Sequence, residues 1–243
     1  MSTLTTYDQH ISHELRIWQK RMKKRPSFFN AASKSIQVRI NRAIPEKVHV
    51  AITTAIKQMT RTMIFGVGIA TKKPLKEISL QEREQLVLNS IKIYRNTATA
   101  EGAITGAGGI LLGLADFPLW LTIKMKMLFD IAAKYGFDTS DYKERVYILH
   151  IFELTFSSQK HRNKIYSLMA NWEEEQQLLP DDMNQFDWRS FQQEYRDYID
   201  LAKLLQLIPG IGAVVGAYVN HRLTNKLGRF AMNAYRMRIA NKK

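Results

Sequence analysis

Two short glycine-rich segments constrain this chain more than any other feature of its sequence. Eight of the twelve glycines lie within Glu101–Leu121 and Leu204–Asn220. Four glycines of the first segment share one helical face, at Gly102, Gly106, Gly109 and Gly113. Glycine inside a helix costs about 1 kcal/mol relative to alanine. The close approach of a second helix is a gain that compensates for such a cost.

The second glycine-rich segment repeats the pattern on a smaller scale. Gly212 and Gly216 are four residues apart, so they also lie on one helical face. The spacing predicts that the two segments pack against each other, or against a second copy, along a seam of small residues.

Neither segment reaches the length of a membrane-spanning helix, which needs about 20 apolar residues. Residues 102–115 are uncharged over 14 positions, and residues 204–220 over 17 positions that include Pro209 and Gly210. Two interpretations remain open: buried helices in the core of a bundle, or a re-entrant or interfacial hairpin.

Helical periodicity dominates the rest of the chain. Ile11, Leu15, Trp18 and Met22 form one helical stripe, and Ser79–Glu82 has the sequence of a capping box. Strand-like alternation is absent from the sequence. We therefore predict an all-α bundle of about eight helices around the two glycine-rich helices, with no significant sheet. A basic N-terminal helix over 1–25, which could move independently, precedes a single helical domain over 26–243.

The charge is strongly polarised along the chain, within a net charge of +14. Residues 16–76 hold fifteen Lys and Arg against one acid, and residues 221–243 hold seven against none. Residues 173–200 reverse the balance, with nine acids against two arginines. Such a field attracts an anionic surface to the basic stretches, unless the acidic stretch neutralises them inside the fold. The candidate contacts to an anionic surface flank the glycine-rich segments: Lys124, Lys126, Arg222, Lys226 and Arg229.

The sequence offers little support for catalysis. Cysteine is absent, so disulfides, thiolate metal sites and a cysteine nucleophile are excluded. Phosphate-binding loops and nucleophile elbows are also absent, and we assign no catalytic, cofactor-binding or metal-binding residue. The polar residues expected to be partly buried are Glu101, Asp116, Glu144, Arg145 and His150. A soluble helical enzyme with a carboxylate and histidine site near Glu101, Asp116 and His150 is the alternative function.

The N-terminus and the composition of the basic segments bear on localisation and partners. The polar N-terminus lacks the basic and apolar regions of a signal peptide, so cytoplasmic residence is expected. A nucleic-acid-binding module is a further alternative, but the basic segments lack the interleaved aromatic residues of single-strand binders.

Four motifs resemble the EcsC protein family. They are the run from Glu101 to Pro118, EGAITGAGGILLGLADFP, the run DYKER at Asp141–Arg145, IPGIGA at Ile208–Ala213, and IPEK at Ile44–Lys47, which resembles the N-terminal signature of the family. The resemblance covers residues 11–238. It implies a mainly bacterial family of unknown biochemical function, without established catalytic residues, whose namesake is encoded beside an ABC exporter.

We therefore expect a non-enzymatic, peripheral membrane-associated accessory protein, linked to an ABC exporter. Its partners are expected to be an anionic membrane surface at the inner face of the cell membrane and exporter subunits, without a cofactor.

Overall fold

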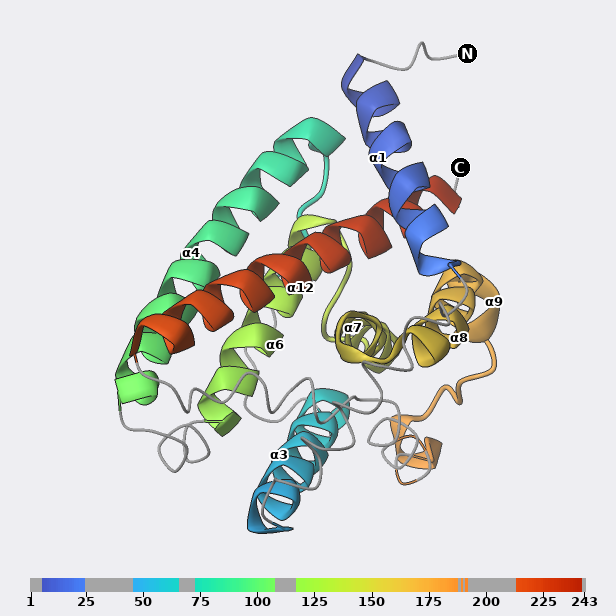
Figure 1. The fold of residues 1–243 in the computed structure, drawn as a ribbon. Coiled ribbons are helices and arrows are strands. Elements are labelled where there is room, and N and C mark those ends of the chain that lie inside the picture. Colours follow the sequence, from blue (N-terminus) through green and yellow to red (C-terminus); the bar gives the residue numbers. More distant parts are fainter. Residues whose placement is uncertain are drawn as a thin grey trace.

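The computed structural model describes residues 6–24, 46–65, 73–107, 117–187, 189, 191 and 213–241. These residues form eight α-helices and one short 3₁₀ turn, without a sheet among them, which confirms the predicted all-α class (Figure 1). The elements are α1 (Thr6–Met22), α3 (Glu46–Phe65), α4 (Leu80–Ala107), α6 (Phe117–Lys134), α7 (Tyr142–Phe156), α8 (Gln159–Ala170), α9 (Trp172–Glu175), η1 (Met183–Gln185) and α12 (Ala213–Asn241).

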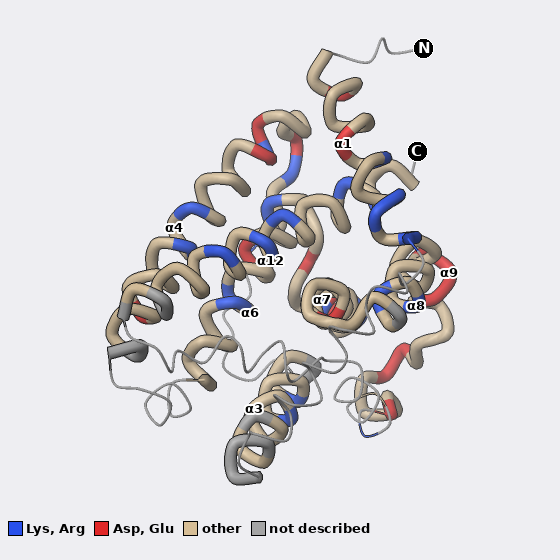
Figure 2. Tube along the Cα trace, viewed as in Figure 1, with Lys and Arg blue, Asp and Glu red and all other residues tan. Residues whose placement is uncertain are grey.

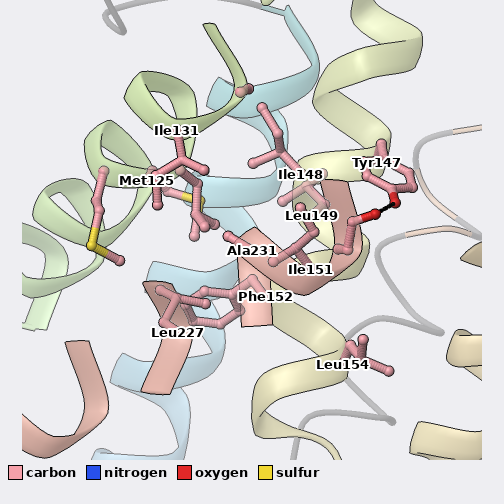
Figure 3. Close-up of a cluster of buried hydrophobic side chains, with 14 of the residues drawn as sticks. Met125, Ile131, Tyr147, Ile148, Leu149, Ile151, Phe152, Leu154, Leu227 and Ala231 are labelled. Carbon is pink, nitrogen blue, oxygen red and sulfur yellow. Dashed lines mark hydrogen bonds between the residues drawn. The ribbon is translucent and has the colours of Figure 1, made fainter. Parts of the chain in front are cut away.

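Helix α7 is the centre of the core. All but one of its residues are buried, and Figure 1 shows α6, α8 and α12 arranged around it. Apolar residues occur on every side of this helix, which is typical of a helix enclosed by others. Figure 3 shows Ile148, Ile151 and Phe152 of this helix packed with Met125 of α6 and Leu227 of α12. The Tyr147 hydroxyl donates to the Ala234 carbonyl at 2.9 Å, which satisfies a polar group inside this cluster.

Local signals in the sequence set the helix boundaries. The Ser79 hydroxyl accepts from the Glu82 amide at 3.2 Å while the Glu82 carboxylate accepts from the Ser79 amide at 2.9 Å, as the predicted capping box requires. Asp141 caps α7 by accepting from the Lys143 amide. Gly136 follows α6 with a φ of +90°, the left-handed conformation that glycine adopts without strain.

One predicted helix differs from the structure. The sequence pattern predicts a continuous helix over residues 159–177, but the chain turns at Asn171 between α8 and α9. The turn brings the Trp172 side chain into the core, where 3% of its surface remains exposed. Burial of a large aromatic ring therefore outweighs continuation of the helix.

Helices α4 and α12 form the most extensive helix pair of the described residues. The end of α4 and the start of α12, which belong to the two glycine-rich segments, lie together at the lower left of Figure 1. Gly102 is buried in α4, and Gly106 and Gly216 are helical. Gly109, Gly113 and Gly212 of the predicted seam lie outside the described residues, as does Asp116. Among the described residues, no helix has the length and apolar character to cross a membrane.

Close approach of α4 and α12 depends on a glycine that sequence reasoning did not single out. A Cβ placed on Gly228 would lie 2.6 Å from Cγ1 of Ile91, a buried residue of α4. Isoleucine is stiff about χ1, so its side chain cannot simply rotate away. We expect Gly228→Ala to lower the free energy of unfolding by about 1–3 kcal/mol, as measured by urea denaturation.

The double variant Gly228→Ala/Ile91→Ala is the control. Removal of the Ile91 side chain makes room for the new methyl group, so the double variant is expected to be less destabilised than the sum of the single variants. Strict additivity of the two changes would contradict the proposed contact.

Candidate functional site

A buried ion pair connects helices that are far apart in the sequence. The Arg236 guanidinium of α12 donates from Nε to Glu84 Oε1 at 2.7 Å and from Nη2 to Glu84 Oε2 at 2.6 Å. Glu84 of α4 is 1% exposed and Arg236 is 8% exposed. The Tyr135 hydroxyl also donates to Glu84, at 3.1 Å. Burial and the Glu84 charge raise the pKa of Tyr135 well above its ordinary value, so the phenol keeps its proton.

Helix α1 is attached to the same carboxylate. Its Tyr7 hydroxyl donates to Glu84 Oε2 at 2.7 Å, and its Glu14 accepts from Arg236 Nη1 at 2.9 Å. Further along α1, the Trp18 ring packs edge-on against Phe230 of α12 at 6.0 Å. The basic N-terminal helix therefore packs on the core, while its predicted independence from residues 26–243 stays a prediction.

A groove of about 790 Å³ lies between α1, α4 and α12. We call it the α1–α12 groove. Figure 1 shows α12 running from the end of α4 to α1. The α12 residues that line the groove include Arg222, Lys226, Arg229, Asn233 and Arg236. Their spacing of 4, 3, 4 and 3 residues places them on one face of α12. Figure 2 shows Lys and Arg as blue bands along α12.

A second buried ion pair fixes the end of α12. Arg238 donates from Nη1 to Glu144 of α7, and the Tyr235 hydroxyl donates to the same carboxylate at 2.6 Å. The Arg238 guanidinium lies 4.3 Å from the ring centre of Phe137 and 4.7 Å from that of Tyr147. The charge is thus paired and also stacked on aromatic faces, which is how a buried arginine is stabilised.

The DYKER motif has a structural role at every position. Asp141 caps α7, the Tyr142 hydroxyl donates to the Pro180 carbonyl, and Lys143 forms an ion pair with Asp181 at 2.9 Å. Glu144 pairs with Arg238, as described above. Arg145 donates from Nε and Nη2 to the carbonyls of Thr139 and Ser140, both at 2.9 Å. These contacts cap α7 and attach it to the preceding turn, to residues 180–181 and to α12.

Lys124 lies in the core, which corrects the expectation that it contacts an anionic surface. None of its side chain is exposed, because α6 turns this residue toward α12. Its amine donates to Asn220 Oδ1 at 3.5 Å and lies 4.5 Å from the Trp120 ring centre. Burial lowers the pKa of the Lys124 amine to about 7, although the charge of Glu101 acts in the opposite direction.

His150 and Glu153 form a hydrogen-bonded pair beside a second, smaller cavity. His150 Nδ1 lies 3.0 Å from Glu153 Oε2, and both side chains are buried in α7. The His150 ring is packed against Trp172 at 5.9 Å and Phe191 at 5.5 Å. This cavity, of about 170 Å³, has mostly apolar walls and does not include Glu101.

Two residues of the alternative enzyme site have different partners, and the third, Asp116, lies outside the described residues. The charge of Glu101 acts on Lys124. His150 is hydrogen-bonded to Glu153 and packs against Trp172. Within the described ranges there is also no cluster of three or more His, Cys, Asp or Glu residues that could hold a metal ion.

The other predicted polar residues are distributed over the structure. Glu144, Arg145 and His150 are buried, and Glu101 is partly buried. Lys126, Arg222 and Arg229 are exposed. Lys226 is partly buried, since its amine donates to the Thr155 carbonyl at 2.8 Å.

Sequence reasoning missed Glu84, Arg236, Arg238 and Asn220. A usable signal exists for two of them. Glu84 precedes Val87 and Ile91 at helical spacing, and Arg238 follows Leu227, Ala231 and Ala234. A charge on an apolar stripe predicts a buried and paired charge.

These features define an all-α, basic protein in which the best-defined motif stabilises the fold. The chain belongs to the EcsC protein family, whose profile matches residues 9–239. It is 43% identical over 235 residues to Protein EcsC of Bacillus subtilis (strain 168), which covers 96% of this chain and 97% of that protein. It is 33% identical over 164 residues to the uncharacterized protein YdbA of the same organism, which covers 68% of this chain and 60% of that protein. No solved structure gives a significant match.

The Glu84–Arg236 pair generates a stability prediction. Glu84→Gln leaves a buried guanidinium without its bidentate carboxylate, and such a loss costs about 3–5 kcal/mol. We expect a decrease of that size in the free energy of unfolding, measured by urea denaturation at neutral pH. Glu174→Gln, an exposed position on α9, is the control and should stay within about 0.5 kcal/mol of the parent. Equal effects of the two substitutions would contradict the pairing.

The lowered pKa of Lys124 generates a pH prediction. Between pH 7 and the ordinary value of 10.5, the unfolded chain binds a proton that the folded chain releases. Stability therefore rises with pH across this window, by up to about 1.4 kcal/mol per pH unit.

Lys124→Met removes the titrating amine. We expect this variant to be at least as stable as the parent at pH 7. Its free energy of unfolding should then rise less steeply with pH, because the contribution of Lys124 is gone. Urea denaturation of both proteins at pH 7, 8 and 9 measures the difference. Parallel pH dependences would show that Lys124 keeps its ordinary pKa.

Proposed function

We propose that the protein is a non-enzymatic accessory protein that binds peripherally to the anionic inner face of the cell membrane. The observation that carries the proposal is an exposed apolar end of the helical bundle with basic residues next to it.

The apolar end is formed by the end of α4 and the starts of α6 and α12, which lie together in Figure 1. Four large side chains there are exposed: Ile104 at 73%, Leu119 at 53%, Val214 at 83% and Tyr218 at 62%. All four lie within the two glycine-rich segments, on three different helices. Clustered exposed apolar side chains favour a role in binding.

Basic residues follow the apolar end at helical spacing. Lys126 lies two turns after Leu119 on the same face of α6, and Arg222 lies one turn after Tyr218 on α12. Both are exposed. In this arrangement the apolar side chains can enter the boundary of the acyl chains while the cations remain among anionic headgroups. Each cation near such a surface contributes about 1 kcal/mol.

The family resemblance supplies the candidate protein partner. Because the namesake is encoded beside an ABC exporter, an exporter subunit at the same membrane surface is the partner we propose. The different partners of Glu101 and His150 favour this role over an enzyme, and the apolar end favours it over a nucleic-acid-binding module.

Vesicle co-sedimentation tests the proposal. The purified full chain is expected to pellet with vesicles that contain phosphatidylglycerol, and much less with pure phosphatidylcholine vesicles. Val214→Glu places a charge in the apolar end and is expected to weaken partitioning at least tenfold, since an apolar side chain that leaves water contributes about 1.5–3 kcal/mol. Lys126→Gln is expected to weaken it about fivefold on anionic vesicles only.

Leu178→Glu is the matched control, because Leu178 is 80% exposed but follows α9, away from the apolar end. It should partition like the parent. Equal loss in the Leu178 and Val214 variants, or no pelleting of the parent at low salt, would refute the proposal. Retention on DNA that falls steeply with salt would then favour the nucleic-acid alternative.

A further inference from the structure

The charge of the α1–α12 groove is unevenly neutralised. At one end, Arg236 is paired with Glu84 and Glu14. Toward the other end, Arg21 of α1 and both Arg222 and Arg229 of α12 line the groove. All three are exposed, and none forms an ion pair with another residue of the described ranges. The groove therefore has a neutralised end and a cationic end.

The middle of the groove is apolar. Ile11, Ile17 and Trp18 line it from α1, Leu88 from α4 and Phe230 from α12. Ile17 is 40% exposed and Leu88 is 48% exposed, so both walls present apolar surface that the fold leaves uncovered. A ligand that covers these side chains removes apolar surface from water, which stabilises its binding.

The dimensions of the groove match a small amphiphile. Its volume of about 790 Å³ lies within the range of roughly 300–1,000 Å³ that small-molecule sites occupy. The lining residues of α12 extend from Arg222 to Arg236, a length of about 21 Å along the helix. An elongated ligand can thus place an anionic group at the cationic end and an apolar chain against Ile17 and Leu88.

We propose that the α1–α12 groove binds a single-chain anionic amphiphile, an acyl chain that ends in a carboxylate or phosphate. Arg21, Arg222 and Arg229 hold the anionic group, because arginine donates two parallel hydrogen bonds to such groups. This site goes beyond the proposed membrane docking, since it binds its ligand one molecule at a time in solution.

Calorimetric titration of the full chain with oleate, below its micelle concentration, tests the site. We expect saturable binding of one oleate per chain. Oleyl alcohol lacks the anionic group, and inorganic phosphate lacks the chain, so each should bind at least tenfold more weakly. Lysophosphatidate should bind like oleate and extend the site to phosphate headgroups.

Two variants locate the ligand. The double variant Arg21→Gln/Arg229→Gln should lower the oleate affinity at least tenfold by removing cations from one end. Leu88→Ser should lower it severalfold by removing an apolar wall. Leu86→Ser is the matched control for the wall, because Leu86 is 42% exposed on α4 but does not line the groove; it should bind oleate like the parent.

The vesicle and oleate measurements fail independently. Val214→Glu should lose vesicle partitioning and keep oleate binding, whereas Leu88→Ser should do the reverse. Absence of oleate binding, equal affinities in the Leu86 and Leu88 variants, or inorganic phosphate bound as tightly as oleate would overturn the groove proposal. Tighter binding of an acidic peptide than of oleate would overturn it in favour of a protein partner.

Discussion

The Glu84–Arg236 ion pair is the interaction on which the arrangement of the other helices depends. The pair joins α4 to α12. Its carboxylate also accepts a hydrogen bond from Tyr135, the residue that follows α6. Helix α1 is attached to the pair through Tyr7 and Glu14. A guanidinium that is 8% exposed is tolerated in a helical core only when its hydrogen bonds are satisfied. Arg236 of α12 can therefore be buried only beside the Glu84 carboxylate of α4. Helix α1 can pack there only because Tyr7 and Glu14 complete the hydrogen bonds of this pair.

Helix α12 combines two different faces. One face holds Leu227, Ala231 and Ala234 against the core, and the approach to α4 is close because Gly228 has no side chain. The other face lines the α1–α12 groove, and cations recur along it from Arg222 to Arg236. At one end of this row Arg236 is paired with Glu84 and Glu14. At the other end Arg222 and Arg229 are exposed, and there we propose that an anion binds. The same helix begins at the exposed apolar residues Val214 and Tyr218, so the proposed membrane contact and the proposed ligand groove share one rigid element.

Of the motifs that resemble the family, DYKER is the one that the structure describes in full, and its contacts stabilise the fold. In DYKER, a cap, two ion pairs and two carbonyl contacts account for the side chains of Asp141, Lys143, Glu144 and Arg145. The sequence predicts Lys124 at the surface, but the fold buries it completely. Its position follows from the rotation of α6, which buries Trp120, Lys124 and Leu128 on one face. A flanking lysine is therefore weak evidence for a surface contact until the buried face of its helix is known.

The sequence by itself determined the all-α class, the stripe of α1, the capping box at Ser79 and the helix end at Gly136. These features depend on hydrogen bonds and dihedral angles within a few residues, so local spacing is sufficient to predict them. Apolar stripes also contain the signal that Glu84 and Arg238 are buried. Only the tertiary structure decided that Glu84 pairs with Arg236 across 152 positions, that Lys124 faces Asn220, and that α1 and α12 enclose a groove. Those contacts depend on how whole helices rotate and cross, which is set by the packing of every face at once and not by any single stretch of sequence.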